Sequence, residues 1–145
     1  MADSVHVPCG KCFAVNRVAQ PRLSDKPTCG RCKSPLFAAH PAALDDTSFP
    51  KYVEGADLPV VVDFWAGWCG PCRTMAPQFE AASHAAAGKV LFAKVDTEAA
   101  RQVAARFDIR SIPTMIAFRG GREVARQSGA LNQSQILHWL SSLPG

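Results

Sequence analysis

The chain has 145 residues, 48% hydrophobic and 19% charged, a composition typical of a globular protein with a buried core. Its longest apolar runs, such as Val60 to Val62, are only as long as a strand, which excludes a membrane-spanning helix. The formal charge of +4 comes entirely from residues 1–40, with six Lys or Arg against two Asp or Glu. This excess is too sparse for a phosphate-binding tract, so we expect no nucleic-acid partner.

The first residues lack the basic stretch and apolar segment of a secretory signal. We therefore expect a cytoplasmic, reducing location, where paired cysteines bind metal or perform redox chemistry more often than they form permanent disulfides. The six cysteines form three Cys-x-x-Cys pairs, and none is left over.

Residues 1–37 are predicted to form a small zinc-binding module. Cys9/Cys12 and Cys29/Cys32 lie in near-identical turns, a spacing typical of a four-thiolate zinc site. Two disulfides or four free thiols are the alternatives. A segment this short buries too little apolar surface to fold alone, so we expect one zinc ion to stabilise it. The basic residues of the segment would partly balance the negative charge of the four thiolates.

Residues 38–145 are predicted to form a second domain, which begins with a junction around Pro41. The apolar pattern and turn residues predict these elements in order: a strand at 42–44, a helix at 48–53 capped by Thr47 or Ser48, a buried strand at 60–65, a helix at 69–88 kinked at Pro77, a buried strand at 89–95, a helix at 98–107, two strands at 114–118 and 123–127 joined through Gly120-Gly121, and a helix at 132–143 capped by Asn132. Helical crossovers need parallel strands and the hairpin adds an antiparallel pair. The order therefore predicts a three-layer α/β/α sandwich with a mixed sheet.

The third cysteine pair follows a buried strand and starts a helix. Unpaired N–H groups and the helix dipole favour an anion there, so the pKa of Cys69 should fall below that of a free thiol. Cys72 lies about one turn further on and can close a disulfide. Cys69 would then attack a substrate disulfide and Cys72 would resolve the mixed disulfide. Half a zinc site is the alternative, but no further pair remains to complete it.

The segment Trp68-Cys69-Gly70-Pro71-Cys72, after the strand Val60 to Trp65, resembles the active site of the thioredoxin family, and the similarity covers roughly residues 41–145. The resemblance implies the thioredoxin fold and assigns Asp63 as the buried acid that assists deprotonation of Cys72. From the residues alone, a strand-end aspartate bonded to backbone remains open. Lys94 matches a lysine that lies near the buried acid in the family. The alternative is that Lys94 points to the surface.

The resemblance also implies a shallow, mostly apolar substrate groove beside a cis-proline. Its residues would be Trp68, Gly70, Pro71, Ile112, Pro113 and Gly129. The Gly-Pro dipeptide accompanies reducing members of the family, so we expect a protein-disulfide reductase.

The N-terminal module narrows the resemblance to the zinc-containing bacterial branch of the family, the thioredoxin 2 type. This branch implies disulfide-containing protein substrates, an NADPH-dependent thioredoxin reductase as partner, and no organic cofactor. The sequence does not determine the oligomeric state, and we take the protein as a monomer. Two rivals remain open: a redox-inactive scaffold used for binding, and an oxidase or isomerase. The zinc is either structural or a sensor of oxidants.

Overall fold

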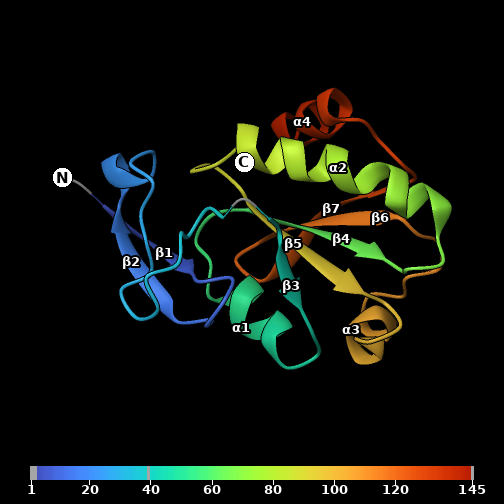
Figure 1. The fold of residues 1–145 in the computed structure, drawn as a ribbon, viewed down its shortest axis with the longest axis horizontal. Coiled ribbons are helices and arrows are strands. Elements are labelled where there is room, and N and C mark those ends of the chain that lie inside the picture. Colours follow the sequence, from blue (N-terminus) through green and yellow to red (C-terminus); the bar gives the residue numbers. More distant parts are fainter. Residues whose placement is uncertain (1–2, 39, 145) are drawn as a thin grey trace.

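The structure is a computed structural model that describes residues 3–38 and 40–144. Its elements, in chain order, are β1 (Ser4–Pro8), β2 (Val15–Ala19), the 3-10 turn η1 (Gln20–Arg22), β3 (Ala42–Leu44), α1 (Ser48–Glu54), β4 (Val60–Trp65), α2 (Gly70–Ala85), β5 (Leu91–Asp96), α3 (Arg101–Arg106), β6 (Thr114–Arg119), β7 (Arg122–Ser128) and α4 (Gln133–Ser141). Figure 1 shows two parts, the four-cysteine module (residues 3–37) and the larger sheet domain (residues 40–144).

The sheet domain contains a five-stranded mixed sheet in the order β3-β5-β4-β6-β7. Strands β3, β5 and β4 are parallel, β6 runs antiparallel to β4, and β7 runs antiparallel to β6. The hairpin turn is Gly120-Gly121, and both glycines have positive φ (60° and 79°), as a tight two-residue hairpin turn requires. The predicted mixed sheet is confirmed.

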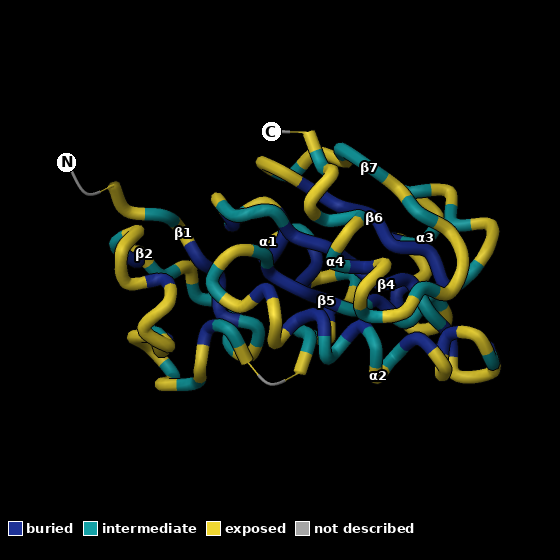
Figure 2. The backbone as a smooth tube through the Cα atoms, turned by 90° about the horizontal axis from the view of Figure 1, so that it is seen from above, coloured by how far each residue is buried: buried dark blue, intermediate teal, exposed yellow. Residues whose placement is uncertain are grey.

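Helices cover both faces of this sheet, with α2 and α4 on one side and α1 and α3 on the other (Figure 1). In β4, Val61 packs with Met75 and Phe79 of α2, whereas Val62 and Phe64 pack on the opposite face. Because side chains alternate along a strand, Asp63 lies on the α2 face. The central strands β5, β4 and β6 are mostly buried, as Figure 2 shows. The three-layer sandwich is therefore confirmed.

The cap of α1 has the predicted position but different hydrogen bonds. Thr47 occupies the N-cap position, but its side chain makes no capping hydrogen bond. The Asp45 carboxylate instead accepts from the N–H groups of Thr47 (3.0 Å) and Ser48 (2.8 Å). Thr47 is therefore the N-cap residue, as predicted, but the side chain that accepts hydrogen bonds at this end is that of Asp45, two residues upstream. The predicted cap of α4 is confirmed, since Asn132 and Gln135 form a reciprocal capping box.

The four-cysteine module packs on the amino-end side of β3 and β5 and shares one apolar core with the sheet domain. Cys9, Cys29 and Leu36 belong to the same buried cluster as Phe49 and Tyr52 of α1. A Cβ on Gly10 would stand 2.8 Å from the Cβ of Ala42, so the first cysteine turn lies directly against β3. The predicted domain boundary after residue 37 stays a prediction.

Candidate active site and metal centre

Cys69 and Cys72 form a disulfide where β4 passes into α2. Cys69 is the N-cap of α2, and the N–H of Cys72 donates to its sulfur at 3.2 Å. Both residues are buried (4% and 2% exposed). A thiolate at Cys69 would receive the same N–H, as the position at the helix start predicted.

The loop before β6 faces this disulfide. The Ile112–Pro113 peptide is cis, as the resemblance implied, and the Ile112 carbonyl oxygen lies 3.7 Å from Cys69 Sγ. Gly129 lies beside it, since its N–H donates to the Pro113 carbonyl at 2.9 Å. Its φ of +95° favours glycine, and the space over its Cα is open. Three segments distant in sequence therefore meet at the disulfide.

The active-site loop exposes an apolar surface around the disulfide. Trp68 is 69% exposed, and Pro71 is also exposed at the first turn of α2. A Cβ on Gly70 would meet no atom within 4 Å. Trp68 and Gly70 thus leave room for another chain to approach Cys69.

Asp63 is buried (1% exposed), and neither carboxylate oxygen has a hydrogen-bond partner among the described residues. The alternative of an aspartate bonded to backbone is therefore wrong. Burial raises the pKa of Asp63 to about 7, although the nearby Lys94 ammonium opposes this rise. A carboxyl that titrates near neutrality can exchange a proton at physiological pH.

Lys94 lies directly across from Asp63 in the β4–β5 register. Its ammonium lies over the Trp65 ring, 4.8 Å from the ring centroid. Lys94 is only partly exposed, so it lies against this site rather than pointing freely to the surface. The pair places one cation and one acid on the same face of the sheet, next to the start of α2.

Sequence reasoning missed two groups of residues that fix the loops. The Arg73 guanidinium donates to the Gly67 carbonyl at 2.7 Å and so braces the turn before Cys69. The Thr114 hydroxyl donates to the Ser111 carbonyl (2.7 Å) and contacts the Ser128 hydroxyl (3.1 Å), which ties the cis-proline loop to β7. The role of Arg73 could have been suspected from the sequence, because Arg73 directly follows Cys72. The contacts of Thr114 with Ser111 and Ser128 could not, because they depend on the fold.

The other four cysteines converge on one point. The sulfur atoms of Cys9, Cys12, Cys29 and Cys32 all lie within 4.8 Å of one another. Tetrahedral zinc with Zn–S bonds of about 2.3 Å needs sulfurs about 3.8 Å apart. The Cys9–Cys32 and Cys12–Cys29 separations are 3.5 and 3.6 Å, so the set fits a zinc ion.

The two cysteine turns repeat the same backbone geometry. Lys11 and Arg31 donate their N–H groups to the sulfurs of Cys9 (3.3 Å) and Cys29 (3.4 Å). Each turn then reverses through a residue with positive φ, Phe13 at 63° and Lys33 at 67°. The residue types at these two positions gave no signal of that conformation.

Comparisons with known proteins agree with both halves of the chain. The Thioredoxin family model matches residues 40–142, and the zinc-ribbon model described as "Thioredoxin 2, N-terminal" matches residues 8–34. Thioredoxin C-3 of Corynebacterium nephridii is 42% identical over 91% of this chain and 90% of its own length. Thioredoxin 1 of Nostoc sp. is 42% identical over 66% of this chain and 89% of its own length. The thioredoxin of Alicyclobacillus acidocaldarius is 45% identical over 64% of this chain and 88% of its own length.

Among the described residues, no helix has the length and apolar character needed to cross a membrane.

Proposed function

The chain belongs to the thioredoxin family, and on this premise we propose how its own residues carry the reaction and which partners it serves. It is a thiol–disulfide oxidoreductase that reduces protein disulfides through Cys69 and Cys72. The observation that carries the proposal is the Cys69–Cys72 disulfide at the start of α2, faced by the cis-proline loop.

In the proposed reaction, the Cys69 thiolate attacks one sulfur of a substrate disulfide and releases the other as a thiolate, which takes up a proton. Cys72 then loses its proton and attacks Cys69 Sγ, so the mixed disulfide breaks and the second substrate sulfur leaves. Two electrons pass to the substrate, which ends as a dithiol, and the enzyme ends as the Cys69–Cys72 disulfide.

We assign Asp63 as the proton acceptor for Cys72, acting directly or through a water molecule. Its burial and its pKa of about 7 support this role, because the ionised and protonated forms are then both populated at neutral pH. Lys94, across from Asp63, would favour the ionised form and so set how readily the proton is accepted.

We propose that substrates dock as an extended segment over the apolar surface of Trp68, Gly70 and Pro71. The backbone of Ile112 would pair with this segment, because such contacts add a short strand to an existing edge. Pro113 in its cis form and Gly129 keep the groove open, since a side chain on Gly129 would stand above it.

We propose that Cys9, Cys12, Cys29 and Cys32 hold one zinc ion with a structural role. Cys9 and Cys29 are fully buried in a core shared with the sheet domain, so the metal would fix the module against that domain. The rival role as an oxidant sensor requires zinc release when the thiolates are oxidised. Peroxide titration with a zinc-binding dye tests it, and zinc retained at peroxide levels that oxidise Cys69 and Cys72 would exclude sensing.

We further propose that the protein acts in the cytoplasm and is recharged by an NADPH-dependent thioredoxin reductase. The test is insulin reduction coupled to NADPH oxidation, with zinc content measured on the same samples. We expect turnover that depends on both the reductase and this protein. Turnover driven by dithiothreitol but not by NADPH and reductase would exclude that partner, and no turnover with either reductant would favour a redox-inactive scaffold.

A further inference from the structure

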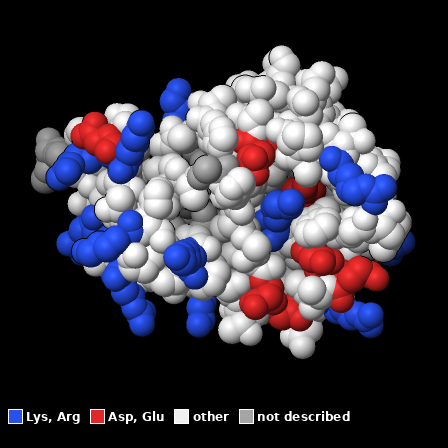
Figure 3. Space-filling model, in the orientation of Figure 1, with Lys and Arg blue, Asp and Glu red and all other residues white. Residues whose placement is uncertain are grey.

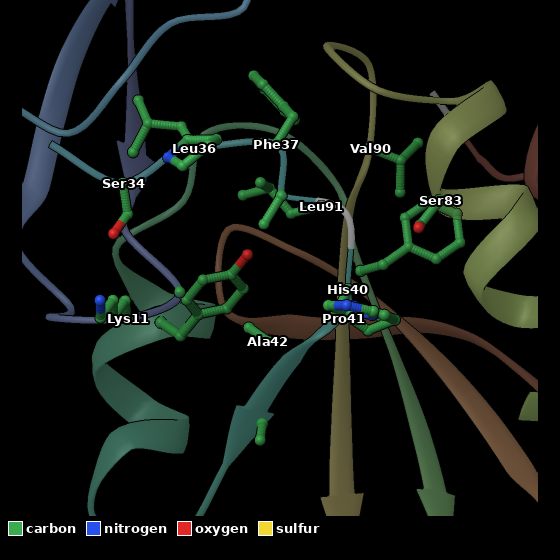
Figure 4. A pocket seen from close by; sticks show the side chains of 16 residues that line it. Lys11, Ser34, Leu36, Phe37, His40, Pro41, Ala42, Ser83, Val90 and Leu91 are labelled. Carbon is green, nitrogen blue, oxygen red and sulfur yellow. The ribbon is translucent and has the colours of Figure 1, made fainter.

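A cavity of about 270 Å³ lies where the four-cysteine module meets the sheet domain. The module supplies Lys11 and residues 34–37 of its wall, Ala38 follows the module, and the sheet domain supplies the amino ends of β3 and β5 (Figure 4). Cys69 follows the carboxyl end of β4, so this cavity is separate from the active site. This volume corresponds to about ten water molecules in the liquid, which is enough for a small organic molecule.

One side of the cavity gathers hydrogen-bond donors. Figure 4 shows Lys11 and Ser34 on this side, and Tyr52 of α1 also lines the cavity. Tyr52 is 2% exposed, and its ring packs edge-on against Phe13. Its phenolic hydroxyl can donate a hydrogen bond to a ligand in the cavity.

The opposite side is apolar. Val90, Leu91 and Phe92 line it, and Leu91 and Phe92 are almost fully buried in the protein core. His40 lines the cavity on this side and contacts the Glu80 carboxylate at 2.6 Å. The carboxylate of Glu80 would repel a second negative charge here, so only one end of the cavity favours an anion.

The charge of the module also favours an anion. Residues 1–40 hold six Lys or Arg against two Asp or Glu, and a zinc site with four thiolates would leave this segment at about +2. Figure 3 shows these cations spread over the module. Lys11 forms no ion pair within the described part of the chain, so its ammonium is available to a ligand.

We propose that this cavity binds a small monocarboxylate with an aryl or branched-alkyl body. The carboxylate accepts hydrogen bonds from the Lys11 ammonium and the Tyr52 hydroxyl, and the body packs against Val90, Leu91 and Phe92. The walls come from both parts of the chain, so the ligand also links the module to the sheet domain. Binding at this cavity does not depend on the proposed redox function.

The test uses the full-length, zinc-loaded protein titrated with 4-phenylbutyrate and with its neutral isostere 4-phenylbutyramide, followed by heteronuclear NMR and calorimetry. We expect the carboxylate to bind about tenfold more tightly than the amide, since a charge-assisted hydrogen bond contributes more than a neutral one. The largest shift changes should fall on residues 34–38 and 90–92.

Lys11→Met keeps the alkyl stem and removes the charge, so it should erase the preference for the carboxylate. Tyr52→Phe should weaken carboxylate binding about fivefold through loss of one donor. Lys33→Met is the matched control, because Lys33 is an exposed cation of the same module that does not line the cavity. Zinc content and insulin reduction should stay unchanged in Lys11→Met, which confirms that the variant folds.

Several results would overturn the proposal. These are absence of binding for both probes, equal affinity for acid and amide, or shift changes centred on Trp68 instead of the cavity. An equal effect of Lys33→Met and Lys11→Met would also overturn it, because the preference would then arise from the net charge of the module and not from this site.

Discussion

The four-cysteine module and the active site begin from the same local contact and end in different chemistry. In both, the N–H of the second cysteine of a Cys-x-x-Cys pair reaches the first sulfur, Cys12 to Cys9 at 3.5 Å and Cys72 to Cys69 at 3.2 Å. After Cys12 the chain reverses through Phe13, with positive φ, and the hairpin brings a second pair alongside. After Cys72 it continues as the helix α2, and no second pair among the described residues approaches. The backbone path after the second cysteine therefore decides between a metal site and a redox site.

The two regions also lie at opposite ends of the central sheet. Figure 1 shows the module on the side where α2 ends, whereas Cys69 lies where α2 begins. The module therefore cannot cover the disulfide in this arrangement. Its influence on catalysis has to pass through the stability of the shared core.

Cys69→Ser should have the largest effect on turnover, and it separates the redox pair from the four cysteines of the module. Turnover in insulin reduction should fall below detection, because no other thiol at this site can start the exchange. Cys72→Ser should instead accumulate mixed disulfides, seen by mass spectrometry as adducts on Cys69. The control is Cys29→Ser, assayed well below its melting temperature, which should keep most of the turnover. Loss of turnover in a folded Cys29→Ser protein would contradict the separation of the two regions.

Removal of zinc should have the next largest effect, on stability. The module shares its core with α1, so chelation should lower the free energy of unfolding by about 3 kcal/mol or more and the melting temperature by roughly 10 °C. Thermal unfolding followed by near-ultraviolet circular dichroism, with and without chelator, measures this loss. The matched control repeats the chelation on Cys29→Ser, where little further loss is expected. An unchanged melting temperature of the wild-type protein would mean that the module folds without metal.

Much of this organisation could be predicted from the sequence. The strand from Val60 to Trp65, the Gly120-Gly121 hairpin and the Asn132 cap depend on local patterns, and all three are observed. The cluster of four cysteines was also predictable because two near-identical turns repeat within a short segment. Features of this kind depend only on residues that are neighbours in the sequence.

Other features depend on contacts between distant residues. The cis form of Pro113 was expected only from the family resemblance, since few X-Pro bonds are cis. The pairing of Lys94 with Asp63 arises from strand register, and the bracing of Gly67 by Arg73 arises from the fold of the loop. The cavity beside Tyr52 exists because two parts of the chain pack together, which no local pattern encodes.

Asp63→Asn should slow turnover and stabilise the protein, a combination that the module's cysteines cannot produce. We expect insulin reduction to slow about 100-fold at the step that needs proton transfer from Cys72. In the wild-type protein, the pKa of Asp63 is about 7 in the native state and about 4 in the unfolded chain. The native state therefore holds a proton that the unfolded chain releases, and stability falls as pH rises through this window.

Asp63→Asn removes the free-energy cost of burying an ionised carboxylate. Asp63→Asn should gain roughly 2 to 4 kcal/mol over wild type at pH 8, and the gain should vanish near pH 4. Denaturant unfolding of the oxidised proteins at both pH values measures it. Asp57→Asn, at an exposed position, serves as the control, and the gain at Asp63 should exceed any change there. A gain that does not depend on pH would show that Asp63 is not the group that titrates.

Asp57→Ala tests the polar contact between the two regions and should have the smallest effect. The Asp57 carboxylate accepts from the backbone N–H of His6 at 2.7 Å and lies 3.0 Å from its ring nitrogen, and the Asp57 N–H donates to the His6 carbonyl. Both side chains are about half exposed, so we expect a loss of only about 0.5 to 1 kcal/mol, with unchanged turnover. The backbone bond survives the substitution, and the apolar contact of Gly10 with Ala42 remains. Urea unfolding measures the loss, and Glu123→Ala, which breaks the remote pair with Arg126, is the matched control. A loss of several kcal/mol confined to Asp57→Ala would show that polar contacts, and not the shared apolar core, hold the module to the sheet domain.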